Sequence, residues 1–547
     1  MLTTALPFIF ALSGAVLGAC EGCHTQPTVV PKADADAATG VATARLYLVS
    51  DLAGALEPCG CVKDQLGGMD HLGALVTAEK SKAKAAAMVS AGPLFFMDME
   101  LEGERRAQDL AKAETIAATL KRLELAAFAP GRNDWAGGAP VLAKLKDASG
   151  APLLAANVEG TAAATPSPHT VKDVGGLKIG FVGVAAPDKA KSSLANVTSS
   201  SAIDGVKAAV AAAKKQGAQA VVVLAAVGRG EAKRIADSVP DVLAIVVGST
   251  GGGGEANTKA APAERVGDVL VVETANHLQT VGVLDLYVRD VAGGAAITFA
   301  DGTGVERMKK REELSSRIDD LRKKIATWEN DKTVDKKDVD ARKADVAKLE
   351  AERTELDKAP PPAKGSFYRY AMRDVREDLG SDEGTKSQML TFYKKVNDEN
   401  KVAFKDRKPA APASGDPKYV GIEACESCHE DPKAVWAKTK HASAYATLER
   451  QFKEFNLDCV SCHVTGYDRP GGSTVTHVSD LKDVQCEVCH GPGQNHAKAQ
   501  GKVKMPIPKP DEKTCLSCHH PPHVHTFDAK AKMAEVLGPG HGKPKPK

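Results

Sequence analysis

The sequence predicts a multidomain protein in which an α/β domain, a helical hairpin and a cysteine-rich C-terminal region follow one another. Its 547 residues are several times the length of a typical domain of about 150 residues. Short Val-, Ile- and Leu-rich runs alternate with Ala-, Lys- and Glu-rich stretches over residues 41–300, whereas eight of the 12 cysteines fall between Cys425 and Cys518. With 26% charged residues and a net charge of +2, the composition is typical of a soluble globular protein and indicates no nucleic-acid partner.

Residues 1–19 predict a signal peptide for export, because they form an uncharged apolar run that ends in small residues. The end of this run, Leu17-Gly18-Ala19-Cys20, resembles a bacterial lipobox. That resemblance implies a lipid on Cys20 and a membrane-anchored protein that faces the periplasm or the cell surface. Cys20-Glu-Gly-Cys23-His24 is also a CxxCH pattern for attachment of c-type haem, and one sulfur cannot carry both groups. Residues 20–40 predict a flexible tether.

The α/β prediction for residues 41–300 rests on seven apolar runs that helical stretches separate. Strands that alternate with helices favour a largely parallel sheet with helices on both faces. The runs span residues 45–50, 85–90, 151–158, 177–184, 218–227, 242–248 and 268–275.

The order of these runs resembles the metallophosphatase domain of the 5′-nucleotidase family, across residues 41–290. That family holds two metal ions with Asp-x-His, Gly-Asp, Gly-Asn-His-Glu, His and His-x-His groups at successive strand ends. The matching places here read Asp51-Leu52-Ala53, Gly92-Pro93, Gly131-Arg132-Asn133-Asp134, Ala225-Ala226-Val227-Gly228 and Gly248-Ser249-Thr250-Gly251-Gly252. Only Asp51 remains as an obvious ligand, so we expect a metallophosphatase-like layered sandwich without metal in residues 41–300 and without two-metal hydrolysis.

Three residues near the first strand keep an active phosphoesterase open as an alternative, with Cys59, Cys61 or His71 as replacement ligands. The Cys59-Gly60-Cys61 sequence is compatible with a disulfide, a soft-metal site or two inert thiols, and export favours the disulfide. Asp51 and Asp134 have a structural alternative as caps of the helices that follow them.

Residues 301–360 predict an antiparallel helical hairpin or coiled coil. Apolar residues recur at steps of three and four on both sides of a break at Asn330-Asp331, and the positions between them are mostly charged. The recurring residues are Leu314, Ile318, Leu321, Ile325, Trp328, Val339, Val346, Leu349 and Leu356. Three prolines at 360–362 end the hairpin, residues 361–408 are expected to return to the α/β domain, and residues 409–417 form a linker.

Residues 418–530 contain four separate CxxCH motifs. Two thiols at this spacing reach both vinyl groups of one haem, and the adjacent histidine becomes the proximal iron ligand. A structural zinc site would make poor use of a histidine directly after the second cysteine. We therefore predict four covalently bound c-type haems on Cys425 and Cys428, Cys459 and Cys462, Cys486 and Cys489, and Cys515 and Cys518, with His429, His463, His490 and His519 as proximal ligands.

A second axial ligand for each iron must come from elsewhere in the chain. The candidates are the remaining histidines near the motifs, which are His441, His477, His496, His520, His523 and His525. The sequence segments around Cys425, His441 and His496 resemble those of the tetrahaem cytochrome family typified by the electron acceptor of hydroxylamine oxidoreductase. The resemblance covers residues 418 to about 527. This resemblance implies that His441 and His496 are distal ligands to haems other than the nearest. Residues 531–547 are a basic tail rich in Pro, Gly and Lys.

These expectations combine into an exported lipoprotein that transfers electrons through four haems, works with unidentified redox proteins and carries a degenerate nucleotidase-like domain. The sequence makes an electron carrier the first hypothesis and leaves two enzymatic alternatives. One is the phosphoesterase described above. The other is a haem enzyme in which an iron without a distal ligand reduces a small nitrogen or sulfur compound.

Overall fold

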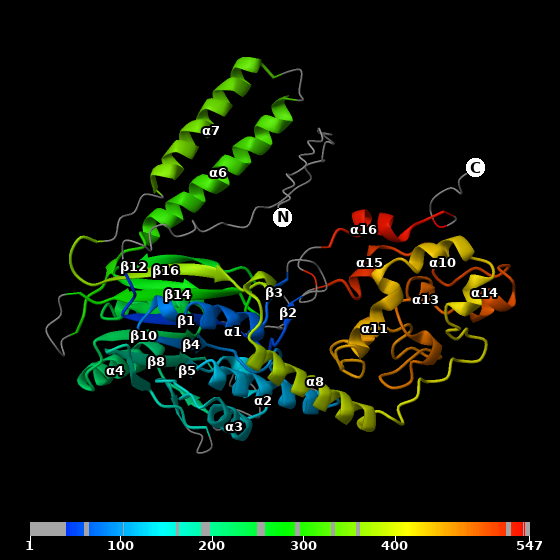
Figure 1. The fold of residues 1–547 in the computed structure, drawn as a ribbon, viewed down its shortest axis with the longest axis horizontal. Helices are drawn as coiled ribbons and strands as arrows, with labels where there is room; N and C mark the ends of the chain where they lie inside the picture. The colour runs from blue at the N-terminus through cyan, green and yellow to red at the C-terminus, as the bar shows by residue number, and fades with distance from the viewer. Residues whose placement is uncertain are drawn as a thin grey trace, which may run out of the picture.

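The computed structural model describes residues 40–59, 65–101, 103–159, 164–186, 197–248, 258–289, 296–329, 334–356, 362–520, 524, 527–539 and 541. In these residues a layered α/β part carries a long pair of helices, and a region of short helices lies beside it (Figure 1). We call residues 418–541 the C-terminal region. No helix within the described ranges has the length and apolar character needed to span a membrane.

Two six-stranded sheets form the centre of the α/β part. The first has the order β15-β16-β14-β1-β4-β5 and consists of β1 (Ala44–Ser50), β4 (Ala86–Ala91), β5 (Leu125–Ala129), β14 (Thr280–Tyr287), β15 (Ala300–Asp301) and β16 (Phe367–Asp374). The second has the order β12-β13-β11-β10-β8-β7 and consists of β7 (His169–Val174), β8 (Leu177–Ala185), β10 (Ala220–Ala226), β11 (Ala244–Val247), β12 (Ala261–Val266) and β13 (Val269–Glu273). Two short pairs are β2 (Pro58–Cys59) with β3 (Leu66–Gly67), and β6 (Val158–Glu159) with β9 (Thr198–Ser199).

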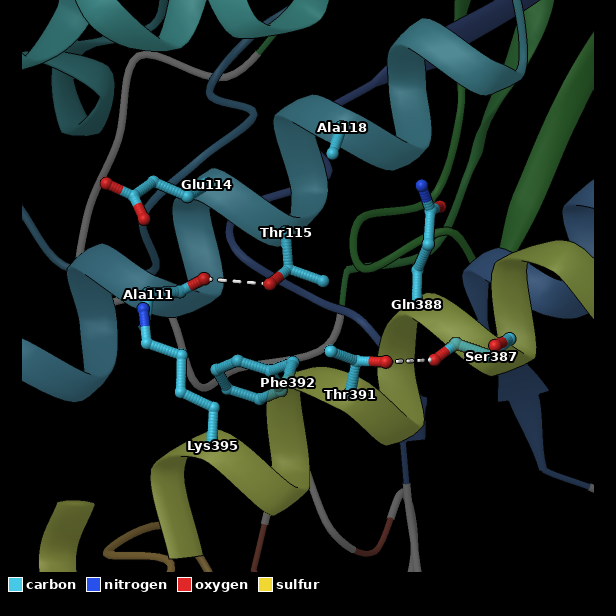
Figure 2. A pocket seen from close by; sticks show the side chains of 9 residues that line it. All are labelled: Ala111, Glu114, Thr115, Ala118, Ser387, Gln388, Thr391, Phe392 and Lys395. Carbon is cyan, nitrogen blue, oxygen red and sulfur yellow. Dashed lines mark hydrogen bonds between the residues drawn. The ribbon is translucent and has the colours of Figure 1, made fainter. Parts of the chain in front are cut away.

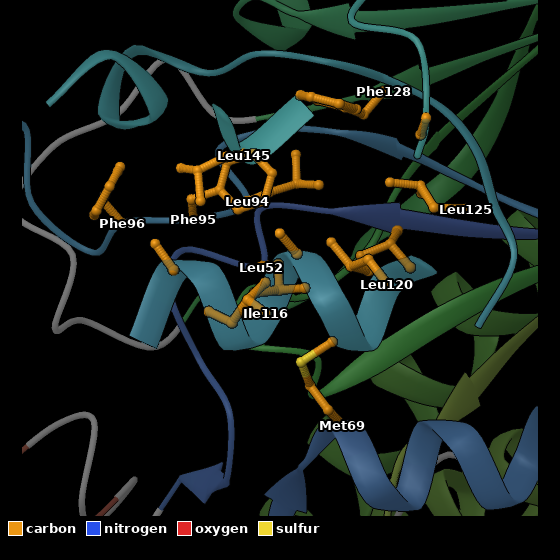
Figure 3. Packing of buried hydrophobic residues seen from close by; sticks show 14 of the residues in the cluster. Leu52, Met69, Leu94, Phe95, Phe96, Ile116, Leu120, Leu125, Phe128 and Leu145 are labelled. Atoms are coloured by element: carbon orange, nitrogen blue, oxygen red, sulfur yellow. The ribbon is translucent and has the colours of Figure 1, made fainter. Parts of the chain in front are cut away.

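Side-chain alternation along the strands produces three apolar layers. Leu46 and Leu48 of β1 lie between the two sheets, whereas Tyr47 and Val49 belong to the layer on the outer face of the first sheet. That outer layer is completed by α1 (Met69–Ala78), α2 (Arg106–Arg122), α3 (Ala139–Ser149) and α8 (Glu383–Ala403), and Figure 3 shows part of it. The outer face of the second sheet packs against α4 (Ala202–Lys215) and α5 (Arg229–Ser238). The predicted α/β layered sandwich is therefore confirmed, whereas the expectation of one largely parallel sheet with helices on both faces is wrong. Each sheet packs one face against the other sheet and its outer face against helices.

Parallel pairing holds in the middle of each sheet, from β1 through β4 to β5 and from β8 through β10 and β11 to β13. One predicted strand, residues 151–158, does not form as a strand along its length. The Leu154 N–H donates to Phe128 O beside the first sheet, and the Ala156 N–H donates to Gly183 O of the second. Because its backbone bonds are divided between two sheets, this segment joins the layers and only Val158–Glu159 forms a strand, β6.

The helical pair consists of α6 (Val305–Glu329) and α7 (Lys336–Leu356). The Asp301 carboxylate starts α6 by accepting hydrogen bonds from the backbone N–H groups of Thr303, Gly304 and Val305. The heptad residues pack against one another between the two helices and form a separate small core of Ile318, Ile325, Val339 and Val346, flanked by Leu321, Trp328, Val334 and Leu349. The two helices bury this apolar stripe against each other and leave their charged faces exposed.

The C-terminal region is built from short helices. They are α9 (Glu423–Glu426), α10 (Glu430–Trp436), α11 (Ala444–Glu449), α12 (Val460–His463), α13 (Cys486–His490), α14 (Gln494–Lys498), α15 (Glu512–Leu516) and α16 (Ala529–Val536). Single-turn helical segments of the 3-10 type are Lys80–Lys82, Arg132–Trp135, Glu377–Leu379, Lys440–Ser443 and Ser479–Leu481. The apolar cluster found in this region is small and consists of Tyr445, Val460, Val464 and Val478 with Tyr467 against it.

Helices α2 and α8 hold the C-terminal region at the segment that precedes Cys459, and α8 extends toward that region in Figure 1. The side chain of Gln108, 2% exposed, accepts from the Leu457 N–H at 3.0 Å and from Asn400 Nδ2 at 3.0 Å. Asn400 Nδ2 also donates to Phe455 O at 2.9 Å. These amides satisfy backbone groups that would otherwise be buried without partners.

An ion-pair cluster strengthens the same contact. The Asp458 carboxylate forms ion pairs with Arg105 Nη2 and Lys112 Nζ, each at 2.6 Å. The side chain of Lys112 is only 15% exposed. Burial lowers the pKa of Lys112, but Asp458 and Asp109 raise it by more, so the ammonium stays charged. Asp458 is therefore the main counter-charge that makes this buried lysine tolerable.

We expect Asp458→Asn to lower the free energy of unfolding of the haem-loaded protein by about 3 kcal/mol, because it leaves the Lys112 ammonium without its closest partner. Chemical denaturation followed by circular dichroism measures this change. Asp416→Asn removes the same charge from an exposed position before the C-terminal region and is the matched control. Equal stability of the two variants would contradict the assignment.

Candidate functional site

The four CxxCH motifs each adopt about one turn of helix. The His429 N–H donates to Cys425 O at 3.0 Å, and the His519 N–H donates to Cys515 O at 2.9 Å. One such turn brings two cysteines three positions apart and the following imidazole to the same side of the backbone. The eight motif sulfurs form no disulfide. Each motif thus presents two thiols and one imidazole as a unit, as thioether attachment of a haem requires.

Thiols of different motifs interact with one another. A hydrogen bond with Cys486 raises the pKa of the Cys425 thiol, and a hydrogen bond with Cys462 does the same for the Cys518 thiol. Burial raises the pKa of Cys489 to about 11, with a further contribution from nearby Cys515. The first motif therefore adjoins the third, the second adjoins the fourth, and the third lies near the fourth.

Among the described residues, three of the four motif histidines lie near a second imidazole. The ring centroids of His429 and His496 are 6.0 Å apart, those of His519 and His441 are 6.1 Å apart, and those of His490 and His541 are 5.7 Å apart. A metal ion bound by two imidazoles needs about 2 Å to each nitrogen, so rings at this spacing have room for one ion between them. These three pairs fit a haem iron with two histidine ligands.

Backbone carbonyls orient several of these rings. The Nδ1 atoms of His463, His490 and His496 lie 2.6, 2.8 and 2.6 Å from the carbonyl oxygens of Ala444, Ile507 and Val503. An Nδ1–H that donates to a carbonyl fixes the tautomer in which Nε2 carries the lone pair. The backbone thus prepares Nε2 of each ring as a metal ligand.

Burial acts in the same direction as these hydrogen bonds. It lowers the pKa of His441, His463, His519 and His541, and for His541 the neighbouring His490 and His429 lower it further. A lower pKa favours the neutral imidazole, which is the form that binds a metal ion.

The structure places the two sequence candidates His441 and His496 near motifs other than their nearest ones. His441 lies near His519 of the fourth motif, and His496 lies near His429 of the first. The structure also adds His541, which the sequence reasoning missed because it lies in the basic tail, after the last motif, with no spacing pattern around it. His477 Nδ1 lies 3.1 Å from Thr476 Oγ1, and its ring is in none of the three pairs. His520 lies near His519 and helps to lower the pKa of that histidine, and His523 and His525 lie outside the described residues.

The strand ends of the α/β part are packed backbone against backbone. A Cβ on Gly248 would lie 2.3 Å from Gly92 O, and a Cβ on Gly92 would lie 2.5 Å from the Gly131 N. Nowhere in the described part of the chain do three His, Cys, Asp or Glu side chains group as a metal site requires. The positions 249–252 and Cys61 are outside the described residues, and of Cys59 only the backbone is described, in β2.

Asp134 has a structural role at this place. Its carboxylate is fully buried and accepts hydrogen bonds from the N–H groups of Leu94, Phe95 and Gly131, at 2.8, 2.8 and 2.9 Å. The bond from the Gly131 N–H caps the turn Arg132–Trp135, which contains Asp134 itself, and the other two bonds fix the loop after β4. The helix that follows, α3, has Gly138 at its N-cap, so the expectation that Asp134 caps that helix is wrong. The Asp51 N–H bonds Ala91 O, and the carbonyl of Asp51 accepts from the His277 N–H. His71 Nδ1 lies 2.5 Å from Gly380 O.

Comparison with known proteins bears directly on the motif region. Residues 424–491 match the family described as cytochrome c554 and c-prime. The cytochrome c-554 of Nitrosomonas europaea is 32% identical over a stretch that covers 18% of this chain and 50% of that protein. The chain thus spans about half the length of this relative. These similarities confirm the resemblance predicted from the sequence and support a multihaem cytochrome with covalently bound c-type haem in the C-terminal region.

Solved structures similar to this chain include a 5′-nucleotidase and other hydrolases. A 5′-nucleotidase precursor of Thermus thermophilus has 18% identity and a TM-score of 0.41, over 70% of this chain and 62% of that one. A sulfate thiohydrolase of the same organism has 17% identity and a TM-score of 0.39, over 47% and 55%. A calcineurin-like phosphoesterase of Bacillus subtilis has 16% identity and a TM-score of 0.37, over 46% and 86%. These likenesses carry no conclusion about activity.

A groove of about 300 Å³ lies between α2 and α8, away from the cytochrome c554-like motifs (Figure 2). Thr115 and Thr391 donate their hydroxyls to the carbonyls of Ala111 and Ser387 in their own helices, so neither hydroxyl is directed at a ligand. The lining residues are Ala111, Glu114, Thr115, Ala118, Ser387, Gln388, Thr391, Phe392 and Lys395. The two threonine hydroxyls of the groove are therefore used within their own helices.

We expect Asp134→Asn to destabilise the protein at pH 7 by about 1–3 kcal/mol, because an amide NH₂ would face the Gly131 N–H. Burial raises the pKa of Asp134 from 3.8 to about 6 in the folded protein. The stability linked to this shift is complete below pH about 4 and is lost as the pH rises through about 6. The stability difference between wild type and variant should thus fall from pH 4 to 6 and stay constant above. A difference independent of pH would contradict the raised pKa of Asp134.

Proposed function

We propose that this protein is an exported, lipid-anchored cytochrome that transfers electrons through four covalently bound c-type haems to or from other redox proteins. The observation that carries the proposal is the set of three imidazole pairs, each made of one motif histidine and one histidine from elsewhere. Haem supplies a reversible one-electron iron couple when bound.

The residues of the C-terminal region would have separate roles in holding the haems. The eight motif cysteines attach the haems as thioethers, and the four motif histidines are proximal ligands. His496, His441 and His541 serve as distal ligands opposite His429, His519 and His490. The carbonyls of Ala444, Val503 and Ile507 hold the ligand rings in the metal-binding tautomer.

The contacts between motifs support transfer from one haem to the next. Cys425 lies beside Cys486, Cys489 near Cys515, and Cys518 beside Cys462. This order connects the first motif to the third, the third to the fourth and the fourth to the second. A continuous series of this kind is what an electron carrier needs.

The α/β part is proposed to lack phosphoesterase activity. Backbone contacts between Gly92, Gly131 and Gly248 fill the strand ends, and Asp134 is engaged by three N–H groups. Two-metal hydrolysis requires two adjacent cations with several hard ligands, for which Ala226 and Val227 provide no donor atoms.

A second candidate function concerns the haem of the second motif. His463 bonds Ala444 O and lies beside the apolar cluster of Val460 and Val464, whereas the three imidazole pairs involve the other motifs. An iron with one histidine ligand would bind a small nitrogen or sulfur compound. A high-spin spectral component that shifts when nitrite or carbon monoxide is added would favour this enzyme over the carrier.

Intact mass spectrometry of the mature protein tests the haem count and the anchor together. We expect four haem increments, together with the mass of a diacylglyceryl group on Cys20. Three or fewer increments would contradict the count, and a fifth would place a haem on Cys20 and Cys23. A Cys459→Ser and Cys462→Ser double variant should lose one increment, which calibrates the measurement.

We expect His541→Ala to keep all four haems and to convert one of them from low spin to high spin, because the thioethers remain while one axial ligand is lost. Electron paramagnetic resonance and haem quantification measure both quantities. His541→Met should restore a low-spin iron with a raised reduction potential, since thioether ligation favours ferrous iron. His169→Ala, in β7 of the α/β part, is the control. An unchanged spin state in His541→Ala would remove His541 from the ligand set.

A further inference from the structure

We propose that the exposed segment of residues 498–509, here the lysine loop, is the docking surface for an acidic electron-transfer protein. This inference rests on the proposed function, because it assigns a partner of defined charge to the same haem-binding region. The loop lies between α14 and α15 and contains the sequence Lys-Ala-Gln-Gly-Lys-Val-Lys-Met-Pro-Ile-Pro-Lys.

Positive charge is concentrated in this loop. Residues 491–510 contain Lys498, Lys502, Lys504 and Lys509 and no Asp or Glu, although the whole chain of 547 residues has a net charge of only +2. All four lysines are exposed, and none of the ion pairs found among the described residues involves them. Four uncompensated charges on one short segment attract an anionic surface.

Exposed apolar side chains lie among these lysines. Val503 is 47% exposed and Ile507 is 40% exposed, and both belong to the few large hydrophobic residues that the described surface leaves open. An apolar centre within a charged rim is typical of protein interfaces, in which the charges guide the encounter and the apolar groups hold it.

The lysine loop is connected directly to two candidate iron ligands. Val503 O accepts from His496 Nδ1 at 2.6 Å, and Ile507 O accepts from His490 Nδ1 at 2.8 Å. The N–H of Gly501 also bonds His496 O at 3.0 Å, and the N–H of Ile507 bonds His490 O at 3.0 Å. A partner bound on Val503 and Ile507 would thus contact residues whose carbonyls hydrogen-bond directly to His496 and His490, which belong to two different imidazole pairs. This position favours a redox protein over an anionic membrane as the occupant.

The test uses the haem-loaded protein and an acidic flavodoxin as the probe. The variant carries Lys498→Glu, Lys502→Glu, Lys504→Glu and Lys509→Glu. Its control carries four identical changes on the exposed faces of the hairpin helices, at Lys323, Lys324, Lys336 and Lys337. Stopped-flow spectroscopy gives the rate constant for electron transfer from reduced flavodoxin at several salt concentrations, and calorimetry gives the affinity for oxidised flavodoxin.

We expect the loop variant to react at least about tenfold more slowly than the control at low salt and to lose the salt dependence that wild type and control share. Its affinity for oxidised flavodoxin should fall in parallel. Equal rates in both variants, with four haems present in each, would overturn the docking surface and leave the proposed function intact. Absence of haem from wild type would instead overturn the proposed function.

Two further outcomes would also overturn the docking surface. If the loop variant shows altered haem potentials at an unchanged rate with flavodoxin, the lysines neutralise haem propionates. If a Cys20→Ser form, which lacks the proposed lipid, binds vesicles of phosphatidylglycerol and phosphatidylcholine, and the loop variant in the same form loses only that binding, the loop contacts an anionic membrane.

Discussion

The pairing of imidazoles across the C-terminal region is the constraint on which the rest of that region depends. Its short helices bury few apolar side chains, and its cluster around Tyr445 and Val460 is small. Each pair instead joins a motif to a distant segment. The first motif is joined to α14, the third motif to residue 541, and the fourth motif to the turn Lys440–Ser443. When iron is bound between such rings, coordination and folding become the same event.

The α/β part is stabilised in a different way, by side-chain alternation that fills three apolar layers. The two kinds of stability meet at the segment before Cys459. There Gln108, Asn400 and Lys112 bind the backbone and the carboxylate that precede the second motif. The α/β part thus supports one motif through these contacts.

The strand ends of the α/β part are held by contacts of their own backbone. Direct contact between Gly92 and Gly248 leaves the backbones close together, and Asp134 binds three N–H groups there. Buried N–H groups need acceptors whether or not a metal is present. A carboxylate at this place is therefore retained by the backbone it satisfies, and its presence in the sequence is no evidence for catalysis.

Local patterns in the sequence determined the α/β class, the hairpin and the four CxxCH motifs, because strand alternation, heptad spacing and thioether chemistry each act over a few residues. The sequence also indicated His441 and His496, through phrases typical of one family. Only the tertiary structure placed His541 opposite His490, divided residues 151–158 between two sheets and gave Asp134 its N–H partners. These features join segments far apart in the chain, and no local periodicity encodes which distant groups will meet.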